Sequence, residues 1–257
     1  MLALKPRPLP SKPRRPERES RMTFVVGLKC HIGLVLCSDS QEGDGISKKN
    51  VPKLRFYQRG GEWGVAWGCS GESDIIGKFN EQIERALKNE PHKSDDSALI
   101  RVPALIERIV LSLKNDYPSA NLAIVCGFWQ ELGGLVFRFY SMDMRVNNCI
   151  AQQEDYACVG LDTSLAVFVL ESLHNSALVI EEGIGLAVFA TKLIKDTAEG
   201  VGGPTQMLTY RMANSEWKEY EEAYIDSIEA KYKTEEVVEL LRKYWGRKNP
   251  SWLPPLG

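Results

Sequence analysis

The chain has 257 residues, of which 44% are hydrophobic and 26% charged, as is usual for a soluble globular protein with a core. Its net charge of −2 gives no reason to expect nucleic acid or an anionic membrane as a partner, and no apolar run is long enough to span a membrane. The six cysteines include no Cys-x-x-Cys pair and the three histidines lack metal-ligand spacing, so we expect reduced thiols, a cytoplasmic location, no metal and no cofactor.

Residues 1–22 differ in composition from the rest of the chain. They contain five Pro, seven Lys or Arg and two Glu, so the remaining residues have a net charge of −7. Such a segment cannot bury enough apolar surface to order itself. It could be a targeting arm, a pro-segment or the product of a start codon read too early. We favour the last, because Met22 stands directly before Thr23.

The first half of the remaining chain predicts two strand pairs and then two helices. Alternating apolar residues and turn signals predict strands over 23–29, 33–39, 54–57 and 63–68. Ser70 is the expected N-cap of the first helix, and Pro103 lies near the start of the second. Apolar residues at helical spacing form one face of each helix: Ile75, Ile76, Phe79, Ile83 and Leu87, then Ile106, Ile109, Val110 and Leu113.

The second half repeats this order and ends in a helical tail. Strands are predicted over 122–129, 135–140, 156–159 and 207–211, and helices over 164–173, 181–195 and 215–245. Helices grouped between strand clusters predict an α+β fold in which two antiparallel sheets lie between helical layers, a four-layer αββα sandwich. We expect a leader over 1–22, one domain over 23–212 and a helical extension over 213–257.

Three residues of the first strands are candidates for chemistry: Thr23, Asp39 and Lys53. A threonine hydroxyl needs a base, and the residue's own α-amine can serve because its pKa of about 8 leaves it partly neutral near pH 7. A lysine nearby lowers the proton affinity of that amine, and a carboxylate keeps the lysine charged and oriented. Each residue is unremarkable alone, since a strand Thr, a strand-end Asp and a loop Lys are common.

The spacing of these residues resembles the opening hairpin of proteasome β subunits and their bacterial relatives, which are N-terminal nucleophile hydrolases. In that family a Thr begins the mature chain, a Gly follows four residues later and an acidic residue sixteen residues later, as do Gly27 and Asp39 after Thr23. Lys53 precedes an apolar residue, as the family's lysine does. The chain is accordingly identified as a divergent, bacterial-type proteasome homologue over residues 23–211.

Further segments extend the resemblance and imply more site residues. Residues 68–72 match a Gly-x-x-Gly-acidic pattern, which implies that the backbone N–H of Gly68 stabilises the oxyanion. Ala66 and Ser70 would lie beside the substrate. Residues 195–200 resemble the loop whose Asp, here Asp196, orients or polarises the threonine.

Two positions depart from the family pattern. Leu161 stands where the family often has a serine that bonds near the threonine amine, and Glu199 replaces a second serine. A leucine cannot make that bond, and a glutamate adds charge. The resemblance therefore also admits a modified site, and for Asp196 and Glu199 a solvated loop is an equally good interpretation.

The resemblance implies a threonine-type endopeptidase that hydrolyses peptide bonds through a Thr23 acyl-enzyme. It also implies a homo-oligomeric ring, a peptide or unfolded-protein substrate and an ATP-dependent unfoldase as a partner. Two alternatives remain open: a non-catalytic ring subunit that keeps residues 1–22, and a small-molecule amidase of the same fold. A peptidase would require the amine of Thr23 to be free.

Overall fold

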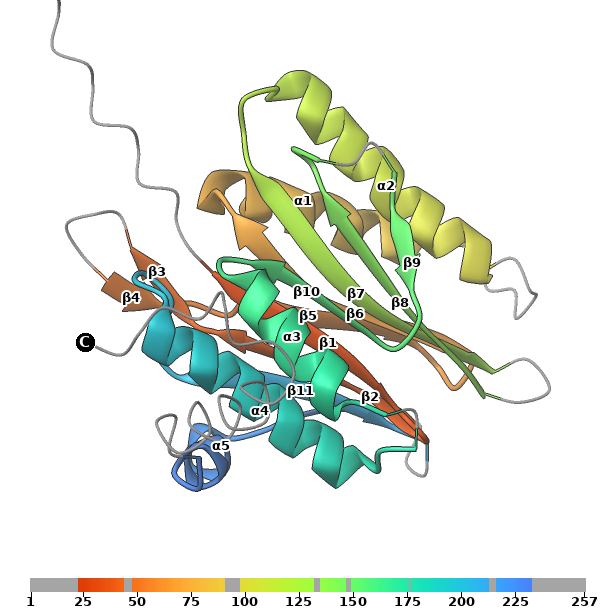
Figure 1. The fold of residues 1–257 in the computed structure, drawn as a ribbon. Helices are drawn as coiled ribbons and strands as arrows, with labels where there is room; N and C mark the ends of the chain where they lie inside the picture. Colours follow the sequence, from red (N-terminus) through yellow and green to blue (C-terminus); the bar gives the residue numbers. More distant parts are fainter. Residues whose placement is uncertain are drawn as a thin grey trace, which may run out of the picture.

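The computed structural model describes residues 23–43, 48–90, 98–131, 135–146, 149–175, 177–212 and 216–232 (Figure 1). The expected leader, residues 1–22, lies outside the described residues, as does most of the expected C-terminal extension.

Two five-stranded antiparallel sheets form the centre of the molecule. The first has the order β10-β1-β2-β11-β12 and the second β5-β6-β7-β8-β9. The strands of the first are β1 (Phe24–Cys30), β2 (Gly33–Asp39), β10 (Tyr156–Gly160), β11 (Thr205–Arg211) and β12 (Glu216–Glu219). Those of the second are β5 (Leu54–Arg59), β6 (Trp63–Gly71), β7 (Leu122–Glu131), β8 (Leu135–Asp143) and β9 (Ala151–Gln153). A small hairpin, β3 (Gln41–Gly43) and β4 (Lys48–Asn50), leads from β2 to β5.

Helices cover the outer face of each sheet (Figure 1). Those packed on the second sheet are α1 (Ser73–Asn89) and α2 (Ala98–Asp116). Those packed on the first are α3 (Thr163–Leu173), α4 (Ile180–Thr197) and α5 (Glu222–Glu229). The predicted four-layer αββα sandwich is confirmed.

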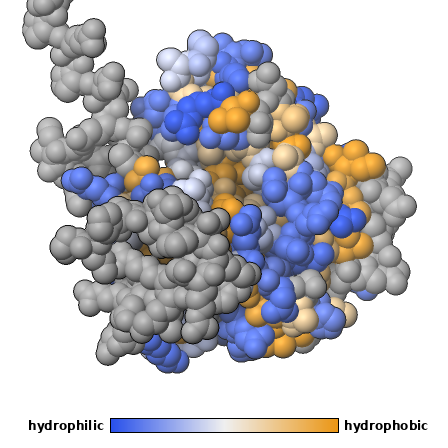
Figure 2. Space-filling view, viewed as in Figure 1, coloured by the Kyte–Doolittle hydropathy of each residue, from blue (hydrophilic) through white to orange (hydrophobic). Residues whose placement is uncertain are grey.

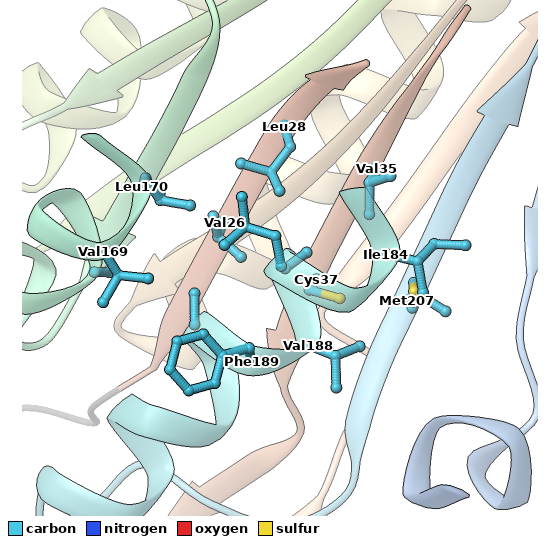
Figure 3. Packing of buried hydrophobic residues seen from close by; sticks show 14 of the residues in the cluster. Val26, Leu28, Val35, Cys37, Val169, Leu170, Ile184, Val188, Phe189 and Met207 are labelled. Atoms are coloured by element: carbon cyan, nitrogen blue, oxygen red, sulfur yellow. The ribbon is translucent and has the colours of Figure 1, made fainter. Parts of the chain in front are cut away.

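The layering explains why the central strands are buried along their whole length and mostly apolar. Every residue of β2 and β6 is buried, because one face of each strand meets the opposite sheet and the other meets helices. Figure 3 shows the core between the first sheet and its helices, where Val26 of β1 and Cys37 of β2 face Val188 and Phe189 of α4. Burying each large aliphatic or aromatic side chain contributes about 1.5–3 kcal/mol.

Some expected boundaries are wrong for identifiable reasons. Ser70 is not the N-cap of α1, because β6 pairs with β7 as far as Gly71 and the helix begins at Ser73. Pro103 lies further inside α2 than the sequence predicts. The expected helix over 215–245 is wrong at its start, because β12 occupies residues 216–219, adds to the edge of the first sheet and buries Trp217 beside Tyr210.

The described surface mixes polar and apolar side chains. In Figure 2, hydrophilic residues cover much of the visible described face and hydrophobic residues occur in small groups between them. Within the described part of the chain, no helix is both long and apolar enough to cross a membrane.

Candidate active site

Thr23 lies directly before β1, at one end of the first sheet, and is only 4% exposed. Its carbonyl oxygen accepts two hydrogen bonds, from the Leu161 N–H at 3.1 Å and from Ser70 Oγ at 3.2 Å. The two donors come from different sheets, since Leu161 follows β10 and Ser70 lies in β6. The backbone of Thr23 is thus held between the sheets.

A close approach of β10 to Thr23 requires a glycine. Gly160 has φ +116°, a conformation that side-chain-bearing residues rarely adopt. A Cβ at this position would lie 1.8 Å from the Thr23 carbonyl oxygen. Gly160 therefore lets β10 end against the residue that carries the candidate nucleophile.

The ammonium group of Lys53 joins Thr23 to Asp39. Lys53 Nζ donates to Thr23 Oγ1 at 2.8 Å, to Asp39 Oδ2 at 2.9 Å and to the Gln41 carbonyl oxygen at 2.6 Å. These three bonds use all the donors of an ammonium group. Because its side chain is only 7% exposed, Lys53 is fixed in position and largely shielded from water.

Asp39, at the end of β2, is fully buried. One carboxylate oxygen accepts the Phe24 N–H at 2.9 Å, and the other accepts Lys53 Nζ and, at 3.3 Å, the Gly202 N–H. The two backbone donors come from β1 and from the loop after α4. The backbone therefore orients the carboxylate independently of its contact with the lysine.

Burial and pairing act in opposite directions on this ion pair. Burial lowers the pKa of the Lys53 ammonium, whereas the charge of Asp39 opposes that change. Burial raises the pKa of the Asp39 carboxyl, against the influence of Lys53 and of the Phe24 and Gly202 N–H groups. The pair holds a positive charge beside the Thr23 hydroxyl in a site with little water, where electrostatic effects are strong.

The expected substrate-side residues lie on the inner face of β6. Ala66 is fully buried in the core between the sheets. A Cβ at Gly68 would lie 2.5 Å from Val25 Cγ1 and 2.9 Å from Leu54 Cδ2, so packing alone requires a glycine there. The oxyanion role of Gly68 and the substrate contacts of Ala66 and Ser70 remain predictions.

Of the three remaining candidates, Leu161 contacts Thr23, whereas Asp196 and Glu199 lie at the surface. The Leu161 N–H bonds Thr23, while its side chain packs against the core under α3 and α4. Asp196 lies in the last turn of α4, and its carboxylate accepts a bond from Lys192 Nζ at 2.7 Å. Glu199 is exposed in the turn that follows. Their influence on Thr23 stays a prediction.

Sequence reasoning missed several residues that shape this site. Gln41 and Gly202 supply a backbone acceptor and a backbone donor, and Gln206 of β11 binds the segment that carries Lys53. Backbone contacts leave no residue-type signal in a sequence, and a lone glutamine on a strand matches no motif. Among the described residues, no group of three or more His, Cys, Asp or Glu could hold a metal ion.

Sequence comparison finds proteasome subunits, although no protein-family model matches the chain. The chain is 26% identical over 214 residues to proteasome subunit beta 2 of Pyrococcus furiosus, which covers 80% of this chain and 94% of the relative. It is 25% identical over 185 residues to proteasome subunit beta of Methanothrix thermoacetophila, covering 70% of this chain and 84% of the relative.

Comparison with solved structures finds the same fold in Anbu proteins. An Anbu (Gly-1) mutant from Hyphomicrobium sp. strain MC1 has a TM-score of 0.71 at 14% identity, covering 91% of this chain and 99% of that one. Anbu (ancestral beta-subunit) from Yersinia bercovieri has a TM-score of 0.69, with the same identity and coverage. The chain is thus similar to proteasome β subunits over most of its length and has the fold of Anbu proteins, which supports a divergent proteasome-like protein.

Proposed function

We propose that this protein is a threonine-type endopeptidase whose nucleophile is Thr23. The observation that carries the proposal is the position of Lys53 Nζ, 2.8 Å from Thr23 Oγ1 and 2.9 Å from Asp39 Oδ2. If Lys53 were only a solvated loop residue and Asp39 only a structural strand residue, nothing would require the two to meet at the Thr23 hydroxyl. Burial of the pair strengthens the argument, because an ion pair taken out of water costs free energy unless its partners are well arranged.

The site supports an acyl-transfer sequence. The Thr23 hydroxyl attacks the scissile carbonyl, and its proton passes to the α-amine of the same residue, which then donates it to the leaving amine. Lys53 disfavours protonation of that amine by like-charge repulsion and stabilises negative charge on Oγ1. The Gly68 N–H is the expected oxyanion donor. Water then hydrolyses the Thr23 ester and releases the second product.

Asp39 and the remaining candidates act around this centre. Asp39 keeps Lys53 protonated and aimed at Oγ1, because it is held by two backbone N–H groups. Asp196 would polarise Thr23 if substrate or a neighbouring subunit drew it from Lys192. The mechanism requires a free amine on Thr23, so no residue before Thr23 remains attached in the active protein.

We also propose that the protein assembles with copies of itself in the cytoplasm. The sequence relatives are proteasome β subunits, and a fold relative is described as the helical assembly of the Anbu complex from Pseudomonas aeruginosa, with a TM-score of 0.64 at 17% identity. Assembly around enclosed sites would restrict substrates to peptides and unfolded proteins. An ATP-dependent unfoldase is the partner that would supply unfolded chains.

A peptide epoxyketone, which reacts with both the hydroxyl and the amine of an N-terminal threonine, tests the catalytic proposal. Intact-mass measurement should show a chain that begins at Thr23 and gains one inhibitor mass. Thr23→Ala should abolish labelling, whereas Ser172→Ala, which removes an exposed hydroxyl on α3, should leave it unchanged. A chain that retains residues 1–22, or labelling that survives Thr23→Ala, would contradict the proposal.

The second candidate function is a non-catalytic ring subunit, which the apolar side chain at Leu161 supports. This residue brings an apolar side chain and a single backbone donor to a position where a hydroxyl would serve catalysis. For such a subunit, assembly would persist while the epoxyketone failed to label Thr23. The labelling experiment, combined with a mass measurement of the assembly, therefore separates the two candidates.

A further inference from the structure

The segment that carries Lys53 belongs to neither main sheet. Val51, Pro52 and Lys53 connect β4 to β5 without forming a strand. The Val51 N–H donates to the Ser40 carbonyl oxygen at 2.9 Å, and Pro52 has no N–H to donate. The position of the Lys53 ammonium therefore depends on how this short segment is held.

The side chain of Gln206 binds this segment at two points. Its Oε1 accepts the Lys53 N–H at 2.7 Å, and its Nε2 donates to the Val51 carbonyl oxygen at 2.7 Å. The amide thus pairs with the carbonyl before Pro52 and the N–H after it. A primary amide suits this task because it carries an acceptor and a donor side by side.

Gln206 is itself fixed to the strand that carries Asp39. It lies in β11 opposite Ser38 of β2, and the neighbouring pair in the same ladder is Thr205 and Asp39. Gln206 therefore links the backbone of Lys53 to the strand register of Asp39. Without this link, the segment would be held by the Val51–Ser40 backbone bond on one side and by the start of β5 at Leu54 on the other, and the Lys53 backbone between them would lose its tie to β11.

We propose that Gln206 is a positioning residue for the reaction, which sets the position of the Lys53 ammonium by clamping the Val51–Lys53 backbone. The inference rests on the proposed function of Thr23 and deepens it. Loss of the clamp would let Lys53 move away from Thr23 Oγ1. The α-amine of Thr23 would then bind its proton more tightly, because the positive charge that opposes protonation would be further away.

Gln206→Met tests this inference in the full protein, because methionine has a similar shape but removes both hydrogen bonds. The measurement is the second-order rate of epoxyketone labelling of Thr23 between pH 5 and 10, with turnover of a fluorogenic peptide. We expect labelling to slow by at least tenfold at neutral pH and its rising limb to move to higher pH. The turnover number should fall while KM changes little, because Gln206 contacts the nucleophile's partner and not the substrate.

Gln206→Glu is the second variant. It keeps an acceptor for the Lys53 N–H but sets an oxygen against the Val51 carbonyl oxygen in place of the donor, so the clamp is lost at that end and labelling should also slow. It also keeps the test open if the methionine variant fails to fold. Gln153→Met is the matched control, since Gln153 is a partly buried glutamine on β9 whose Nε2 bonds Ser141 Oγ at 2.9 Å. Its labelling rate and pH profile should equal those of the unmodified protein.

The outcomes separate this inference from the proposed function. If the unmodified protein is not labelled at Thr23, the proposed function fails. If it is labelled but folded Gln206→Met reacts with the same rate and pH profile, the positioning role is overturned. A slower rate with an unchanged pH profile and a raised KM would also overturn it, because that pattern indicates general damage to the site.

Discussion

At the scale of single residues, the central feature is a lysine with every donor engaged in a site from which water is mostly excluded. Lys53 is shared among a hydroxyl, a carboxylate and a backbone carbonyl. Such an arrangement has a cost for folding, because both charges lose hydration. Two experiments at this scale separate the effect of the ion pair on the free energy of unfolding from its effect on the reactivity of Thr23.

Lys53→Met should destabilise the fold by about 3–5 kcal/mol at neutral pH, because it leaves the buried Asp39 carboxylate without its cation. The pKa of Asp39 is already raised by burial, and removing Lys53 raises it further. The folded state then binds a proton more tightly than the unfolded state, so the deficit should shrink as pH falls through the folded pKa. Denaturant unfolding between pH 5 and 8 measures it.

Lys49→Met is the control for this measurement. Its ammonium lies 3.3 Å from Glu42, but the Lys49 side chain is 70% exposed, and exposed pairs contribute little. Its unfolding free energy should match that of the unmodified protein. An equal loss in both lysine variants, or a deficit in Lys53→Met that does not depend on pH, would contradict the account of the buried pair.

The pH profile of labelling should show an alkaline limb set by Lys53. Burial lowers the pKa of this lysine, so its positive charge is lost at a lower pH than for an exposed lysine. In Lys53→Arg the labelling rate, even if it is lower overall, should no longer fall at high pH, because a guanidinium stays protonated. Epoxyketone labelling of both proteins from pH 7 to 11 makes the comparison. An alkaline limb that persists in the arginine variant would have another origin.

At the scale of elements, the site is made where strand ends converge. β1 begins after Thr23, β2 ends at Asp39, β10 ends at Gly160 and β11 begins beside Asp39. β6 contributes Ser70 from the other sheet. Strand register thus decides which side chains meet, since a shift of one residue would turn Asp39 to the opposite face of its sheet.

Gly160→Ala should disturb this convergence. The new Cβ would collide with the Thr23 carbonyl oxygen, and the positive φ adds strain of about 1–3 kcal/mol. We expect lower stability and slower labelling of Thr23. Gly77→Ala is the opposite case, because its Cβ meets nothing within 4 Å in the middle of α1. That variant should gain about 0.5–1 kcal/mol of stability and label normally.

Thermal unfolding and labelling rates of the two glycine variants provide the comparison. Normal labelling by a fully stable Gly160→Ala would show that β10 and Thr23 do not need their close approach. A loss of stability in Gly77→Ala would contradict the open space beside α1.

At the scale of the whole molecule, the sandwich places three apolar cores in one stack. One lies between the sheets, one beneath α1 and α2, and one beneath α3 and α4. The C-terminal elements add to the last layer, because Lys195 of α4 bonds Glu229 of α5 at 2.9 Å.

The mass of the protein in solution should exceed that of one chain several-fold. Light scattering with electron microscopy measures it, against 28.9 kDa for one chain of all 257 residues. The expected result is a closed or helical assembly of identical subunits at micromolar concentration. A mass equal to one chain over the whole accessible concentration range would contradict the proposed assembly and, with it, the enclosure of the sites.

The amino-acid sequence by itself determined the fold class and the candidate catalytic residues. Apolar periodicity predicted the order of strands and helices as far as β11, apart from the short strands β3, β4 and β9, because each face of a buried element must be apolar whatever it packs against. The spacing of Thr23, Gly27, Asp39 and Lys53 resembles that of proteasome β subunits, because a hairpin and a short loop set those distances along the chain.

Tertiary structure alone decided the supports of the site. Gln206 lies 153 residues from Lys53 along the chain, and Ser70 lies 47 residues from Thr23. Such contacts arise from sheet register and from the packing of one sheet on the other, so no local pattern encodes them. The same reason explains the error at β12: an amphipathic tail can form a helix alone, but the open edge of the first sheet pairs with this segment and buries Trp217 beside Tyr210.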